Sequence, residues 1–93
     1  MTELTLDTFA GAVGEPFSVD AGADGVELIL AEASDLPHSM RSGGGFRLEF
    51  SGPANPLLPQ AIYTMRRGGE AHDIFIVPIA RTAEASRYEA VFF

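Results

Sequence analysis

The side chains of this sequence that are best suited to chemistry are two histidines, His38 and His72, and a set of scattered carboxylates. A zinc-type site would need both histidines to meet a carboxylate such as Asp35 or Asp73. The histidines stand in different segments, and neither an H-x-H nor an H-x-x-x-H spacing occurs, so we expect solvated histidines and no bound metal. The absence of cysteine removes thiolate ligands, disulfides and cysteine nucleophiles.

Other catalytic and cofactor motifs are also missing from the sequence. There is no G-x-S-x-G elbow, and Ser39 would point away from His38 on an extended chain. The glycine run 43–45 precedes a predicted strand and lacks the Lys and Ser/Thr of a phosphate loop. Acidic residues such as Glu27 and Glu49 fall at outward strand positions, which indicates solvated faces rather than a catalytic carboxylate pair. We therefore expect neither an enzyme nor a cofactor.

The charge of the chain is strongly negative. Asp and Glu number 13 against 6 basic residues, all of them Arg, which gives a formal net charge of −7. Such a surface repels phosphate backbones and anionic lipid headgroups, so we expect binding to neither nucleic acid nor membrane. Arg66 and Arg67, with His72 across a predicted hairpin, form a local basic spot. This spot either clamps a carboxylate of a partner or offsets acidic neighbours.

The elements that must position these residues are mainly strands. Apolar and polar residues alternate with a period of two. The alternation predicts strands at 15–20, 26–34, 46–51, 61–66 and 87–93, and residues 72–81 are predicted to form a strand that is apolar on both faces. The inward positions of the second and third strands are Val26, Leu28 and Leu30, then Phe46, Leu48 and Phe50, with Arg47 and Glu49 facing solvent. Pro78 predicts a bulge or an edge position, because proline has no N–H to give to a ladder.

The connections differ in stiffness. Residues 35–45 contain three consecutive glycines and predict a mobile loop, whereas residues 52–60 contain three prolines and predict a stiff crossing between sheets or over a barrel end. Leu6, Phe9 and Val13 predict a short helix within residues 3–13 that covers the end of a sheet or barrel. The fold prediction is a single all-β domain of residues 1–93, a six-stranded antiparallel meander forming a small barrel or a two-sheet sandwich, with a short N-terminal helix.

The chain also resembles a family of small bacterial proteins of unknown function. The similarity is carried by the following residues: Phe46-x-Leu48-x-Phe50-x-Gly52-Pro53, Leu57-Leu58-Pro59-Gln60-x-x-Tyr63, Ile74-Phe75-Ile76-Val77-Pro78-Ile79, Tyr88-Glu89-Ala90-Val91-Phe92, and Leu4-Thr5-Leu6-x-x-Phe9 near the N-terminus. The last residue, Phe93, departs from the Asn that is usual in the family. Members are often encoded near phage-tail-collar-like proteins, so the resemblance implies a structural or accessory role without assigned site residues.

A surplus of apolar residues suggests where a partner binds. A sheet that is covered on one side should be polar on the other, yet several strands carry apolar residues on both faces. The predicted partner surface consists of Ile62, Ile74, Ile76, Val91 and Phe93 on the strands and Leu57 and Leu58 in the proline-rich connection. Either the N-terminal helix covers the strand residues, or they bind a protein partner or a second copy.

Three functions remain open at this stage. The first is a structural or protein-interaction module, such as an accessory of a phage-tail-like assembly. The alternative is a small barrel that binds an apolar ligand inside or at one mouth, and the third, an enzyme, lacks a supporting motif. The N-terminus has no basic region followed by a long apolar run, so no signal peptide is expected, and we expect a cytoplasmic protein.

Overall fold

The computed structural model describes residues 6–20, 25–36, 45–54 and 57–92. Its elements, in chain order, are α1 (Leu6–Ala10), β1 (Pro16–Val19), β2 (Val26–Leu36), β3 (Gly45–Pro53), β4 (Ala61–Arg67), β5 (Glu70–Arg81) and β6 (Ala85–Phe92). These bounds agree with the predicted strands to within a few residues. Most of the predicted mobile loop, residues 37–44, lies outside the described residues.

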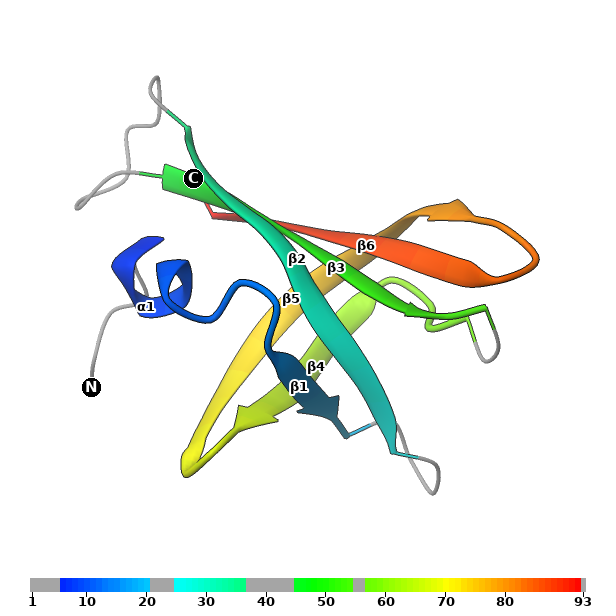
Figure 1. The fold of residues 1–93 in the computed structure, drawn as a ribbon, viewed down its shortest axis with the longest axis horizontal. Coiled ribbons are helices and arrows are strands. Elements are labelled where there is room, and N and C mark those ends of the chain that lie inside the picture. The colour runs from blue at the N-terminus through cyan, green and yellow to red at the C-terminus, as the bar shows by residue number, and fades with distance from the viewer. Residues whose placement is uncertain (1–5, 21–24, 37–44, 55–56, 93) are drawn as a thin grey trace.

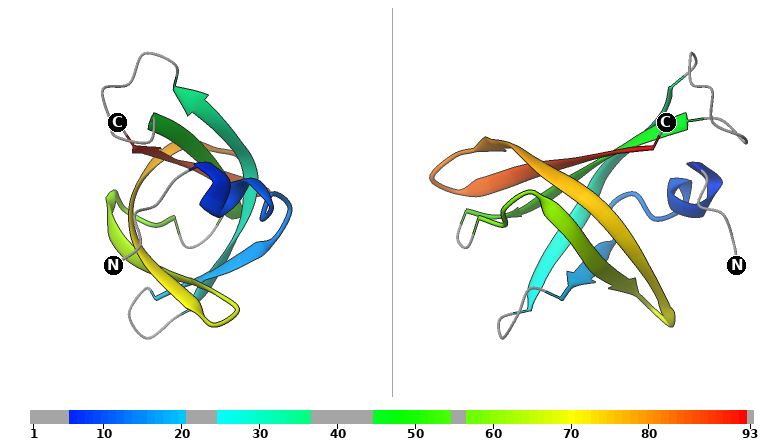
Figure 2. Two further views of the ribbon diagram at one scale, coloured as in Figure 1. Left: turned by 90° about the vertical axis from the view of Figure 1, so that its left-hand side faces the viewer. Right: turned by 180° about the vertical axis from the view of Figure 1, so that it is seen from behind.

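In the described residues, the strands close into one antiparallel barrel in the order β1-β2-β3-β6-β5-β4 (Figures 1 and 2). This confirms the predicted six-stranded barrel with a short helix and decides between barrel and sandwich. The order departs from a plain meander at one step, because β3 pairs with β6 while β4 returns to pair with β1. The spatial order β4-β1-β2-β3 is that of a Greek key. The proline-rich connection makes this crossing, as its composition predicts.

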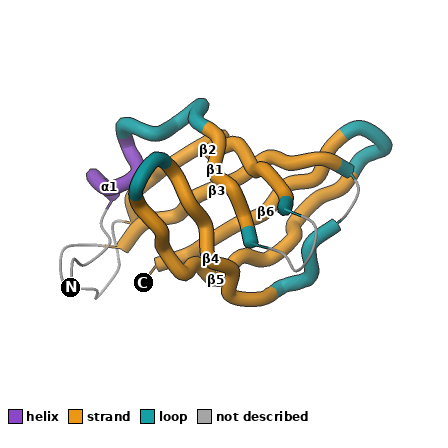
Figure 3. The backbone as a smooth tube through the Cα atoms, turned by 90° about the horizontal axis from the view of Figure 1, so that it is seen from below, coloured by secondary structure: helices purple, strands orange, loops and turns teal. Residues whose placement is uncertain are grey.

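Strand alternation places the core as expected. Val26, Leu28 and Leu30 of β2 are buried and alternate with exposed residues. Register shifts mark two places within the described strands, one between Leu30 and Glu32 and one between Pro78 and Ala80. The second favours the bulge over the edge position, the two alternatives predicted at the proline, which cannot donate to a ladder. Figure 3 shows the strands winding obliquely around the barrel, with α1 at one end.

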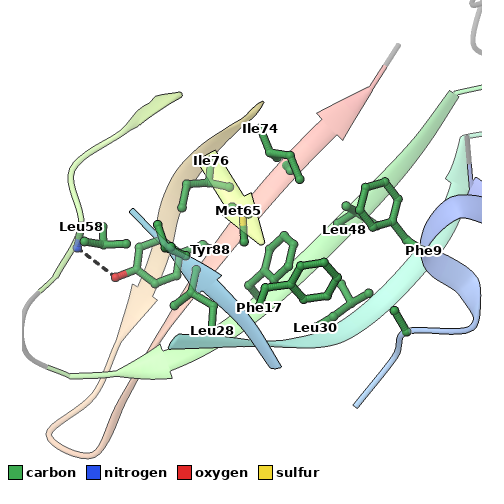
Figure 4. Packing of buried hydrophobic residues seen from close by; sticks show 14 of the residues in the cluster. Phe9, Phe17, Leu28, Leu30, Leu48, Leu58, Met65, Ile74, Ile76 and Tyr88 are labelled. Carbon is green, nitrogen blue, oxygen red and sulfur yellow. Dashed lines mark hydrogen bonds between the residues drawn. The ribbon is translucent and has the colours of Figure 1, made fainter. Parts of the chain in front are cut away.

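The helix α1 is a lid over one end of the barrel, as predicted. Its Phe9 is 1% exposed and enters the core. The Phe9 ring centroid lies 5.8 Å from that of Phe46 and 6.3 Å from those of Phe17 and Phe92, and its edge meets His72 at 5.9 Å. A five-residue helix has little stability alone, so this aromatic packing is what holds it in place. In Figure 4, Phe9 and Leu58 stand at opposite ends of the packed interior.

The crossing from β3 to β4 closes the other end of the barrel through hydrogen bonds to β6. The backbone N–H of Leu58 donates to the Tyr88 hydroxyl at 2.9 Å, and the Ser86 hydroxyl donates to the Pro53 carbonyl at 2.7 Å. The two hydroxyls lie 3.3 Å apart. The Ser86 hydroxyl has a single proton, which it donates to the Pro53 carbonyl. The hydrogen bond between the two hydroxyls is therefore donated by Tyr88 to the Ser86 oxygen. One chain of hydrogen bonds therefore ties both ends of the crossing to β6.

Gly52 lets this crossing begin close to the core. A Cβ atom at this position would overlap the Cδ2 atom of Leu28, whose side chain is fully buried. The requirement is for space, because the backbone of Gly52 does not have a positive φ angle. Further along, the Tyr63 hydroxyl donates to the Pro59 carbonyl at 2.6 Å, and Arg81 Nε donates to the Ala54 carbonyl at 3.0 Å.

Candidate partner-binding site

The outer surface of β4, β5 and β6 carries large apolar side chains that the barrel leaves exposed. Ile62 of β4 and Phe75 of β5 stand directly opposite each other in the ladder and are 68% and 48% exposed. Val77 of β5 pairs with Glu89 of β6. Two residues along each strand from this pair, Phe75 of β5 stands beside Val91 of β6 on the same outer face. We call the outer surface formed by Ile62, Phe75, Ile79 and Val91 the β4–β6 face.

The structure corrects the predicted surface on β5. Ile74 and Ile76 were expected to face outward, but both are fully buried in the core. In the β4–β5 ladder, Ile74 pairs with Tyr63 and Ile76 with Ala61, and residues directly opposite each other share a face. Because Ile62 faces outward, its partner Phe75 does so as well, and the two isoleucines turn inward.

The proline-rich connection is divided between surface and core. Leu57 is exposed, as predicted, but Leu58 is 4% exposed and belongs to the core. The bond between its backbone N–H and Tyr88 draws this residue into the barrel end, so Leu58 is removed from the predicted surface. Phe93, also predicted to contribute, lies outside the described residues.

Of the two alternatives that the sequence left open for the apolar strand residues, cover by the N-terminal helix does not fit the structure. The helix contacts β2 and β3 and closes the barrel end, instead of lying on the β4–β6 face (Figure 2). Leu6 and Phe9 of α1 pack against the core, whereas Val13, predicted on the same side, is exposed. Ile62, Phe75 and Val91 therefore remain accessible to solvent.

Polar contacts border the β4–β6 face on the side of the β4–β5 hairpin. Thr64 pairs with Asp73, and its hydroxyl donates to the Asp73 carboxylate at 2.7 Å. Further along β4, Arg66 donates to Asp20 at 3.1 Å. Arg67 lies 3.6 Å from a carboxylate oxygen of Glu15. The arginine pair thus links β4 to the segments that flank β1, which supports the interpretation that it offsets acidic neighbours.

His72 does not join this arginine pair on the surface. It shares the inward phase of β5 with Ile74, and its ring contacts Phe9 of the lid. Its Nε2 atom lies 3.5 Å from Glu70. Within the described residues, no group of three His, Cys, Asp or Glu side chains can hold a metal ion. His38 and Ser39 lie outside the described part of the chain.

An ion-pair network on the outer surface of β2, β3 and β6 was missed by the sequence analysis. Glu32, Glu49 and Glu89 stand opposite one another on these strands, and Arg47 contacts all three. Hydrogen bonding to Glu89, opposed by partial burial, raises the pKa of Arg47 above its ordinary value. Arg87 lies 3.4 Å from Glu49, which is 8% exposed rather than solvated as predicted.

Comparison with known proteins places the chain in one family. The family described as Domain of unknown function (DUF6916) matches residues 4–92. No curated protein and no solved structure matches the chain. In the part of the chain that the structure describes, no helix is long and apolar enough to cross a membrane.

Proposed function

Because the chain belongs to the DUF6916 family, a family of unknown function, we propose on structural grounds that it is a non-catalytic protein-interaction module. The observation that carries the proposal is the exposed pair of Ile62 and Phe75 on the β4–β6 face. Single exposed apolar residues are normal, but large neighbouring ones on a soluble protein mark a binding surface. Val91 on β6 extends the pair across the sheet, and Ile79 lies four residues further along β5, at the bulge.

The energetics favour a binding role for this surface. Transfer of exposed apolar area out of water stabilises a complex by about 25 cal/mol per Å². Interface energy is concentrated in a few side chains, among which large aromatic anchors are prominent. Phe75 has this character, and Ile62 beside it is the most exposed large hydrophobic residue described. The closed barrel supplies a rigid support, so little ordering is needed on binding.

The alternative of an apolar ligand inside the barrel receives less support. The interior positions are occupied by side chains that contact one another. The Phe17 and Phe50 rings meet edge to face with centroids 5.7 Å apart, and Phe46 stacks on Phe92 at 4.4 Å. Phe9 and Leu58 fill the two ends. A ligand would have to displace this packing, at a cost comparable to that of disturbing a core.

Site-specific photo-crosslinking in the producing cell tests the proposal. A photoreactive phenylalanine analogue at position 75 is expected to give a discrete crosslinked protein product. The same analogue at Ile29, on the opposite side of the barrel, is the matched control and is expected to give none. Ile29 suits this role because it is also an exposed outward strand residue. Absence of a product at position 75, or equal products at both positions, would overturn the proposal.

A further inference from the structure

The net charge of the chain is confined to its first part. Residues 1–53 contain nine acidic residues and two arginines, a net charge of −7. Residues 54–93 contain four acidic residues and four arginines, a net charge of zero. The sum of the two parts is the formal charge of the chain. The boundary falls at the end of β3, so β1 to β3 belong to the acidic part and β4 to β6 to the neutral part.

The barrel topology sets the strands of the two parts on opposite walls. β1, β2 and β3 are neighbours around the barrel, and so are β6, β5 and β4. In the closed order, β2 and β5 are three steps apart in either direction and therefore lie across the barrel from each other. The acidic wall is centred on β2, with exposed Glu27 and Glu32. The neutral wall is centred on β5 and bears the β4–β6 face.

We propose that the β4–β6 face binds the same face of a second copy of the chain, related by a two-fold axis. This inference rests on the proposed interaction function and names its partner. Contact between two neutral walls keeps the exposed carboxylates of β2, such as Glu27 and Glu32, on the outside of the dimer, where the repulsion between the two acidic chains is smallest. The neutral wall is the surface on which self-association meets least electrostatic opposition.

The composition of the face also suits contact with itself. A two-fold axis brings each residue against a patch that contains the same residues, so the patch must be self-complementary. Ile62 and Phe75 are direct neighbours, so a two-fold axis between them sets the isoleucine of each copy against the phenylalanine of the other. Asp73 and Arg66 supply both signs of charge at the border. A head-to-tail contact would instead press this apolar face against the carboxylates of the acidic wall.

The mass of the purified chain, measured by light scattering over a range of concentrations, tests the inference. The chain is expected to approach twice its 9.9 kDa mass as concentration rises. Phe75→Asp and Ile62→Asp are each expected to hold it at the monomer mass. Ile29→Asp, on the acidic wall, is the matched control and is expected to dimerise normally. Urea unfolding of each variant establishes that a loss of dimer is not a loss of fold.

Disulfide trapping provides a second test that avoids a buried charge. The chain has no cysteine, so each single variant introduces one thiol. An equimolar mixture of Ile62→Cys and Phe75→Cys is expected to oxidise to a mixed covalent dimer, and Ile29→Cys is expected to remain monomeric. A mixture of Phe75→Asp and Ile29→Asp distinguishes geometries, because head-to-tail binding would give a dimer only on mixing. That result would overturn the two-fold arrangement.

The failure of this inference and the failure of the proposed function are separable. A wild-type chain that remains monomeric at every concentration overturns the two-fold dimer. If position 75 nevertheless crosslinks a different protein in the cell, the interaction function stands and its partner is heterologous. If the chain dimerises but neither Phe75→Asp nor Ile62→Asp disturbs the dimer, the inferred face is wrong.

Discussion

Removal of the Tyr88 hydroxyl is the most direct test of how the barrel is closed. In the wild type, this oxygen accepts the buried Leu58 N–H at 2.9 Å and lies 3.3 Å from the Ser86 hydroxyl. Tyr88→Phe keeps the ring in the core but leaves the Leu58 N–H without its acceptor. A buried donor without a partner costs about 1–3 kcal/mol. We therefore expect the free energy of unfolding to fall by about 2 kcal/mol.

Tyr63→Phe is the matched control, because both tyrosines bond the same crossing. The Tyr63 hydroxyl donates to the Pro59 carbonyl at an exposed position, where water can replace it. The expected loss is about 0.5 kcal/mol or less, as for most surface changes. The two substitutions remove the same atom from the same residue type, so burial of the bond is the main difference between them.

Urea unfolding at equilibrium measures both losses. For a domain of this size, the loss at Tyr88 corresponds to a fall in melting temperature of roughly 8–16 °C. Hydrogen exchange adds a local readout, because the Leu58 amide is expected to lose protection in Tyr88→Phe and to keep it in Tyr63→Phe. The reasoning is refuted if the two variants lose equal stability, or if the Leu58 amide stays equally protected in both.

Three further predictions use the same unfolding measurement. Gly52→Ala is expected to lower the free energy of unfolding by about 1–3 kcal/mol, because the added methyl group overlaps Leu28. In a double-mutant cycle, Leu28→Val should recover part of this loss by making room for the methyl group. If the losses of the two single variants simply add in the double variant, the overlap is contradicted. Arg47→Met is expected to cost about 1–3 kcal/mol at neutral pH by leaving Glu49 beside like charges. This cost should shrink at high ionic strength, where the repulsion between the carboxylates is screened, and a cost that does not change with salt would count against the network. Burial raises the pKa of the Tyr63 hydroxyl in the folded state above its ordinary value of 10.0. The contribution of the neutral hydroxyl to folding stability is therefore fully present below pH 10.0, and it is lost as the pH rises through the pKa of the folded state. The stability of the wild type relative to Tyr63→Phe should therefore decline as the pH rises above the ordinary tyrosine pKa of about 10, and no decline would refute the raised pKa.

Strand phase was predictable from sequence wherever polar and apolar residues alternate. Phe46 and Leu48 of β3 are buried as the pattern predicts. On β5 the segment 74–79 is apolar on both faces, so its pattern does not indicate which set of residues faces inward. Pairing with β4 decides the phase, because it aligns Phe75 with exposed Ile62. The existence of an apolar surface was therefore predictable, but its residues on β5 were not.

Contacts between segments distant in sequence account for the rest of what was missed. Glu49 is an outward strand residue in a local pattern, yet Arg87 on the adjacent strand β6, together with Arg47 on β3 itself, covers it. The local sequence indicates that Leu58 is an exposed loop residue, but the hydroxyl of Tyr88, thirty residues later, accepts a hydrogen bond from the Leu58 N–H and holds the residue in the core. Both effects depend on the pairing of β3 with β6, which follows from the closed topology and has no signature within either strand.

The pairing of β3 with β6 also has a consequence for the newly made chain. β3 is synthesised well before β6, which is its neighbour in the finished barrel. The edge of β3 that pairs with β6 and the inward phenylalanines of β3 therefore stay unpaired and uncovered until the last strand is made. Unpaired strand edges and exposed apolar surface are what make nascent chains aggregate. Over that interval, the part of the chain already made carries a net charge between −5 and −7. Mutual repulsion between such intermediates keeps neighbouring nascent chains apart until β6 arrives.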